Sequence, residues 1–107
     1  MNAMLNFLGL ANRARKVISG EETVIKRIQR NGVELLIIAE DTSEQTKKMF
    51  IDKCSYYNVK YKVLFSKACL GNAIGKSPRS ACAITDKGFA KKLLSMIEEN
   101  YGGGAHE

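Results

Sequence analysis

The chain has 107 residues, the size of a single domain, and its content of 45% hydrophobic and 26% charged residues excludes a disordered protein. Lys and Arg number 17 and Asp and Glu number 11, so the formal net charge is +6. For so small a domain this excess indicates a polyanionic partner.

The distribution of apolar and basic residues excludes a membrane protein and a secreted protein. No apolar run approaches the ~18–20 residues that span a bilayer, so we expect no membrane partner. The basic residues of segment 13–16 follow the first apolar stretch, which is the reverse of a signal peptide. The first 20 residues lack acids, as mitochondrial transit peptides do, but they continue into a foldable pattern. We therefore expect a cytoplasmic protein.

The cysteines are odd in number and lack Cys-x-x-Cys spacing, which excludes a disulfide framework and a zinc site. All of them fall within apolar stretches and are predicted to be small core residues: Cys54, Cys69 and Cys82.

The first half of the chain predicts two helices and two strands. A helix over 2–16 is followed by a short strand over 17–19, and Gly20 opens a second helix that Asn31-Gly32 stops. Glu21 and Glu22 lie in the first turn of that helix, where acids suit the helix dipole. The continuous apolar run over 35–39 predicts a strand buried on both faces.

The second half continues the alternation. We expect a helix over 44–57, a strand over 61–65 with its odd-numbered residues on one face, and a short helix capped by Ser66 that ends near Gly75. A small-residue strand over 81–85 precedes a last helix capped by Asp86, and a flexible glycine-rich tail covers 102–107. This order predicts a single α/β domain over 1–101 with helices on both faces of one mixed or parallel sheet.

Ligands of such three-layer sandwiches meet the loops at one end of the strands. The loops to consider are Ser19–Thr23, Glu40–Ser43 and Gly75–Ser80.

The sequence contains no recognisable arrangement of catalytic residues. The only histidine, His106, lies beyond a triple glycine, so nothing fixes a base for a Ser–His or Cys–His arrangement. Glu21 and Glu22 are adjacent on a helix and point about 100° apart, which suits dipole complementation better than proton sharing. Gly71–Ser77 reads GNAIGKS, one residue short of a phosphate-binding loop. We expect no enzyme, no cofactor and no metal.

The charge distribution is more informative. No acid occurs from Cys54 through Thr85, a stretch that contains five basic residues: Lys60, Lys62, Lys67, Lys76 and Arg79. The stretch is either an incidentally biased solvated face or a surface that meets nucleic-acid phosphates. Lys26 and Arg27 add charge to the second helix, whose N-terminal amides can meet a phosphate. No aromatic pair forms an RNA-stacking sheet, so we expect recognition of a folded RNA by loops and a helix end.

Four segments carry a family resemblance: SGEETV from Ser19, LIIAED from Leu36, LGNAIG from Leu70 and AITD from Ala83. Together they resemble the kink-turn-binding ribosomal protein family called L-seven-Ae, and within it the small bacterial YlxQ-like branch. The resemblance implies a three-layer α-β-α sandwich with a four-stranded mixed sheet. It also implies a monomeric, non-enzymatic protein that binds structured RNA, ribosomal in origin, and acts with the ribosome or with translation factors.

The resemblance also implies a site, with departures from the family pattern. Glu22 matches the family's glutamate, Glu21 stands where the family has a base-reading asparagine, and the family's glycine falls nearer Ser19 than Gly20. The family's lysine corresponds to Ile25, with Lys26 as its neighbour. The apolar tip of the family's last loop is replaced by polar residues. The RNA-binding residues expected from the sequence are therefore Ser19, Gly20, Glu21, Glu22, Lys26, Arg27, Lys76, Ser77 and Arg79.

These departures leave alternatives open. The leading hypothesis is a protein that binds structured RNA, either a standard kink-turn or another fold. The second is a protein-interaction module that docks an acidic surface of a translation factor or ribosomal protein. A remote third is a fragment of an RNA methyltransferase, since a similar domain precedes some of those enzymes.

Overall fold

The computed structural model describes residues 2–102. Helices and strands alternate as the sequence predicts, and a short π-helical turn, η1, extends the last helix. The predicted tail begins at Gly102, which ends η1, and its remaining residues, 103–107, lie outside the described residues. The elements are α1 (Ala3–Arg13), β1 (Val17–Ser19), α2 (Glu21–Gln29), β2 (Leu35–Ile38), α3 (Glu44–Tyr57), β3 (Lys60–Val63), α4 (Lys67–Ala73), β4 (Ala81–Ile84), α5 (Lys87–Ile97) and η1 (Glu98–Gly102).

The strands form one mixed sheet in the order β1-β4-β2-β3. Strand β2 is parallel to β3, and β4 is antiparallel to both β1 and β2. Consequently β1, β2 and β3 all finish at the end of the sheet where β4 starts. We call this the Ser19 end, after the last residue of β1, and we call the opposite end, where β2 starts, the Leu35 end.

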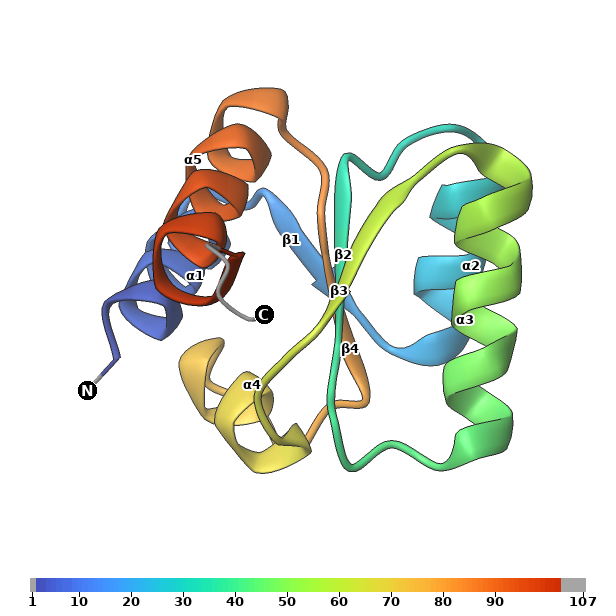
Figure 1. Ribbon diagram of the computed structural model, residues 1–107, viewed down its shortest axis with the longest axis horizontal. Coiled ribbons are helices and arrows are strands. Elements are labelled where there is room, and N and C mark those ends of the chain that lie inside the picture. The colour runs from blue at the N-terminus through green and yellow to red at the C-terminus, as the bar shows by residue number, and fades with distance from the viewer. Residues whose placement is uncertain (1, 103–107) are drawn as a thin grey trace.

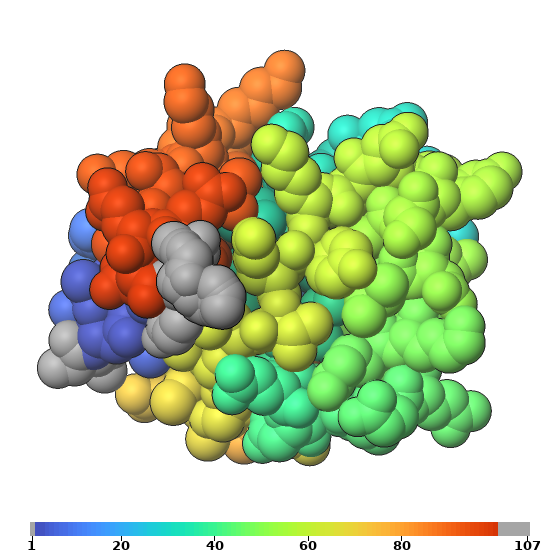
Figure 2. Space-filling view, viewed as in Figure 1, coloured from blue at the N-terminus to red at the C-terminus, as the bar shows by residue number. Residues whose placement is uncertain are grey.

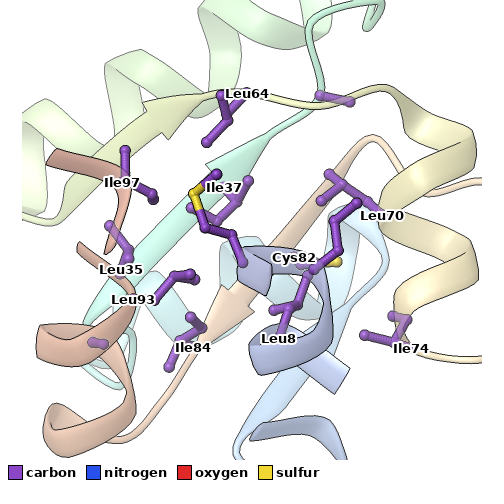
Figure 3. Packing of buried hydrophobic residues seen from close by; sticks show 14 residues of the cluster. Leu8, Leu35, Ile37, Leu64, Leu70, Ile74, Cys82, Ile84, Leu93 and Ile97 are labelled. Atoms are coloured by element: carbon purple, nitrogen blue, oxygen red, sulfur yellow. The ribbon is translucent and has the colours of Figure 1, made fainter. Parts of the chain in front are cut away.

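Helices cover both faces of the sheet, which confirms the three-layer sandwich. Figure 1 shows α1, α4 and α5 on one face and α2 and α3 on the other. The central strands β2 and β4 are buried throughout. Because strand side chains alternate, Leu35 and Ile37 enter the core under α1, α4 and α5, drawn in Figure 3, whereas Leu36 and Ile38 enter the core under α2 and α3.

The helix starts follow the capping pattern in the sequence. The side chains of Ser43, Ser66 and Asp86 each accept a hydrogen bond from a first-turn amide of the helix that follows. Helix α2 differs, because its N-cap is Gly20 and no side chain caps it. Its first-turn amides therefore lack the side-chain acceptor that the other α-helices of the described residues have.

Three predictions need correction. The helix expected over 2–16 ends at Arg13, and Arg15 beyond it has a left-handed φ of 63° that a helix cannot continue through. Cys69 is exposed in the first turn of α4, which turns its buried side, at Leu70, toward the sheet; Cys54 and Cys82 are buried as expected.

The strand predicted over 61–65 ends at Val63. Phe65 has a φ of 67° and its backbone oxygen accepts a hydrogen bond from Glu40, so the chain leaves the sheet there. Tyr61 and Phe65 consequently pack against different cores.

Within residues 2–102, every helix is too short or too polar to cross a membrane.

Candidate nucleic-acid interface

The β1–α2 junction and the loop over 76–80 meet at the Ser19 end of the sheet. Ser19 pairs with Cys82 across β1 and β4, so the loop that leads into β4 must pass beside the junction. Gly20 turns the chain from strand into helix with a φ of 95°, a left-handed value that favours glycine. Two of the three loops that the sequence singled out are therefore neighbours.

Arg79 joins the two segments. Its Nε donates a hydrogen bond of 3.1 Å to Ser19 Oγ, and its Nη1 donates one of 2.9 Å to Ser77 Oγ. A guanidinium has five N–H donors, so the side chain retains donors for a ligand after making these two bonds. The side chain is half-buried and held in one place, which prepares it for bidentate contact with a phosphate.

Ser80 ties the third loop to the same place. Its Oγ donates to Glu21 Oε2 at 3.4 Å, which links the loop to the start of α2. Its carbonyl oxygen accepts bonds from the Ala39 amide at 2.8 Å and from Thr42 Oγ1 at 3.1 Å. The segment between β2 and α3 is therefore fixed at the Ser19 end together with the other two loops.

A glycine in α4 shapes the 76–80 loop. A Cβ added to Gly71 would lie 2.2 Å from the carbonyl oxygen of Ser77, and the Lys76 amide donates to the Gly71 oxygen at 2.8 Å. The loop backbone therefore rests directly on the helix, where no larger residue fits. This close approach gives a physical reason for the LGNAIG segment.

The cations of this end are not neutralised by carboxylates. Within residues 2–102 the ion pairs are Lys47–Glu44 and Lys48–Asp52, both on α3. Lys76 and Arg79 thus carry unpaired charge. The surface is nevertheless mixed, because Glu21 and Glu22 are exposed at the start of α2.

The structure brings some of the predicted site residues together and separates others. Hydrogen bonds or chain neighbours gather Ser19, Gly20, Glu21, Ser77 and Arg79, with Glu22 on the same helical turn and Lys76 exposed in the same loop.

Lys26 and Arg27 lie in the last turn of α2. Arg27 is about 9 Å along the helix axis from Glu21, at a rise of about 1.5 Å per residue, and its alkyl chain packs on Gly32 beyond the helix. Neither residue contributes a hydrogen bond to the cluster around Arg79.

Sequence reasoning missed Ser80 and Thr42 as members of this hydrogen-bonded network. Both belong to loops that the sequence had singled out, but their partners are 59 and 38 residues away in the chain. Only the strand order, which places β4 between β1 and β2, brings these partners close.

The described residues offer no reactive centre here. Burial raises the pKa of the Cys82 thiol to about 12, against a smaller lowering by the Arg79 charge, and burial raises the pKa of Cys54 to about 11. Both thiols are therefore protonated and unreactive near neutral pH. Among residues 2–102, no three His, Cys, Asp or Glu side chains are grouped to hold a metal ion.

Known proteins share both the fold and much of the sequence of this chain. The chain matches the ribosomal protein L7Ae/L30e/S12e/Gadd45 family over residues 2–94. It is 53% identical to the RNA-binding protein YlxQ of Bacillus subtilis strain 168 over 91 residues, which cover 85% of this chain and 91% of the relative. It is 47% identical to the RNA-binding protein YlxQ of Enterococcus faecium over 94 residues, which cover 88% of this chain and 90% of the relative.

A solved structure agrees. A protein of unknown function from Bacillus halodurans superposes with a TM-score of 0.88 at 41% identity, covering 92% of this chain and 99% of the other. The match to the family and the identity to full-length relatives lead to one conclusion: the chain belongs to the ribosomal protein L7Ae/L30e/S12e/Gadd45 family.

Proposed function

We propose that this protein binds structured RNA with the Ser19 end of its sheet and acts with the ribosome or in translation. Its family consists of ribosomal and other RNA-binding proteins, which are not enzymes. The relatives from Bacillus subtilis and Enterococcus faecium are both RNA-binding proteins, and each aligns with most of this chain. The net charge of +6 fits a polyanionic ligand.

One observation carries the placement of the RNA. The Arg79 guanidinium is held between Ser19 and Ser77, joins the start of α2 to the 76–80 loop, and forms no ion pair with a carboxylate of residues 2–102. A fixed, unpaired guanidinium beside uncapped helix amides supplies two kinds of donor to one phosphate-rich ligand.

The proposed contacts divide by chemistry. Lys76, Ser77 and Arg79 meet the phosphate backbone, and Lys26 and Arg27 contact flanking phosphates along α2. Ser19 holds Arg79 in place, Gly20 adds no side chain at the helix start, and Glu22 accepts hydrogen bonds there from base amino groups. Phosphates would hold the RNA in place and the helix start would read its bases.

The proposed RNA has a kinked backbone, and binding to a standard kink-turn is weakened by Glu21. That residue stands where the resembled family has an asparagine, and its carboxylate accepts a bond from Ser80 instead of presenting an amide to a base. A carboxylate in this position also repels phosphate. The polar 76–80 loop offers charge in place of an apolar tip.

A gel-shift titration with a ribosomal RNA fragment that contains a kink-turn tests the proposal. The variant Lys76→Glu should bind about tenfold more weakly, the loss expected for one charge-assisted contact. Lys76 is exposed and its side chain makes no hydrogen bond to the residues that the structure describes, so the fold is not at risk. The matched control is Lys92→Glu, the same change at an exposed lysine of α5, outside the Ser19 end.

The proposal requires Lys92→Glu to stay within about twofold of the unaltered protein, since only long-range charge changes there. Equal losses in the two variants would mean that net charge alone drives binding and would remove the Ser19 end from the account. A duplex of the same length without the kink should bind more weakly than the kinked RNA.

A further inference from the structure

A second cationic surface lies at the Leu35 end of the sheet, away from the proposed RNA site. A groove of about 410 Å³ runs there between the start of β3 and α5. The residues that matter for its chemistry are Leu35, Lys60, Lys87, Ala90, Lys91 and Leu94. In Figure 2 a recess separates the orange α5 from the yellow-green start of β3.

The two walls of the groove come from regular elements. Lys60 opens β3 and pairs with Leu35 at the start of β2, which fixes one wall. The other wall is α5, where positions 87, 90, 91 and 94 share one face of the helix at the spacing i, i+3, i+4, i+7. The two walls therefore rest on a strand and a helix, and Val33, Glu34 and Asn58 from the neighbouring loops complete the lining.

Its charge is not satisfied within the protein. Lys60, Lys87 and Lys91 are exposed, and none of them belongs to the ion pairs found within residues 2–102, which lie on α3. The groove contains one carboxylate, Glu34, which is half-buried. Lysines from both walls thus flank a floor of three apolar residues, in which Leu35 and Ala90 are buried and the half-buried Leu94 offers the apolar surface that a ligand can reach.

This composition favours a protein ligand over RNA. The described residues that line the groove include no aromatic and no arginine side chain, so they offer an unpaired base no stacking surface. The Glu34 carboxylate accepts hydrogen bonds from the amides of a peptide backbone. An apolar side chain fits the floor, and acidic side chains on either side of it meet the lysines of both walls.

We propose that this groove docks an acidic segment of a protein partner, in which an apolar side chain is flanked by aspartates or glutamates. Its position at the Leu35 end leaves the Ser19 end free, so the two surfaces bind their ligands at the same time. The protein then connects an RNA to an acidic protein surface.

The test is a titration of the ¹⁵N-labelled full chain with a synthetic peptide of about ten residues that carries one leucine between pairs of aspartates. The amide signals of residues 33–35, 60 and 87–94 should shift, whereas those of residues 19–22, 76–77 and 79–80 should not. A peptide with serine in place of the leucine should bind about tenfold more weakly, because the apolar contact with the floor is lost. Absence of shifts at millimolar peptide, or equal binding of the two peptides, would overturn the proposal.

Neighbouring lysines provide matched variants. Lys91→Glu should weaken peptide binding about fivefold, while Lys92→Glu, the same change one residue away and outside the groove, should leave it within about twofold. Equal losses would reduce the interaction to net charge and contradict a built site. Both variants are also titrated with the kinked RNA. A loss of RNA affinity confined to Lys91→Glu would assign the groove to RNA and overturn the proposal. The Lys76→Glu test of RNA binding at the Ser19 end is independent of this result.

Discussion

At the scale of single residues, Arg79 shows what a sequence can and cannot predict about a site. Its place in an acid-free stretch predicts a phosphate contact. Its bond to Ser19 was not predictable, because Ser19 is 60 positions away and only the pairing of β1 with β4 brings it close. The charge pattern of the sequence therefore indicated that Arg79 binds a phosphate, whereas its position beside Ser19 depends on the strand order.

Glu21 allows a test of charge at the same scale. Replacement Glu21→Gln removes a negative charge that faces the proposed RNA and keeps an oxygen that accepts the Ser80 bond. We expect RNA affinity to rise about fivefold at fixed salt, as one repulsive surface charge is removed. The control is Glu99→Gln in η1, an exposed carboxylate outside the Ser19 end. A loss of affinity specific to Glu21→Gln would mean instead that this carboxylate reads a base.

The cysteines make a prediction about reactivity. At about pH 8 a thiol reagent should label Cys69 rapidly in the folded protein and reach Cys54 and Cys82 only after unfolding, because burial raises the pKa of both. Because their pKa values are raised in the folded protein, the two buried thiols stabilise the fold below pH 9.0, the ordinary pKa of a thiol. This contribution to the free energy of unfolding is lost as the pH rises toward about 11 for Cys54 and about 12 for Cys82. Counting labelled thiols by mass spectrometry checks the prediction, and rapid native labelling of more than one thiol would contradict it.

At the scale of elements, local signals predicted the bounds of most helices and strands to within about two residues, and the largest error is the first helix, which was expected to reach residue 16 and ends at Arg13. Helix α3 runs over 44–57 as predicted, because Ser43 caps it and Asn58 stops it in a left-handed conformation. Strand β3 was displaced because its bounds depend on pairing with β2, which joins Leu35 to Lys60. The sequence likewise did not predict the direction of β4, because a buried strand of small residues has the same sequence pattern in a parallel and in an antiparallel pair.

The contact between α4 and the loop makes an element-scale prediction. Gly71→Ala should displace the 76–80 loop, because its Cβ would meet the Ser77 oxygen, and should lower the free energy of unfolding by about 2 kcal/mol. RNA affinity should fall with it. Gly75→Ala is the comparison, because its φ of 71° strains any other residue but its Cβ would meet open space.

Urea unfolding and RNA titration of both variants measure the two effects separately. Gly75→Ala should cost about 1 kcal/mol of stability and keep most of the RNA affinity. If Gly71→Ala left both quantities unchanged, the loop would not depend on this close approach.

At the scale of the whole molecule, the fold divides a single stretch of sequence between two surfaces. The acid-free segment from Cys54 to Thr85 predicts one cationic face. In the structure, Lys60 lies in the groove at the Leu35 end, whereas Lys76 and Arg79 lie at the Ser19 end. The chain crosses the sheet from one end to the other in β3, so charges that are close in sequence are separated by the length of a strand.

The most direct test of the central claim is the salt dependence of RNA binding in the unaltered protein and in Arg79→Gln. Contact with about four phosphates predicts that log K falls with log salt at a slope of about −3 to −4. The account predicts that Arg79→Gln binds more weakly and that its slope is less steep by about one. A slope and an affinity that are the same in Arg79→Gln as in the unaltered protein would contradict the claim that Arg79 meets a phosphate at the Ser19 end.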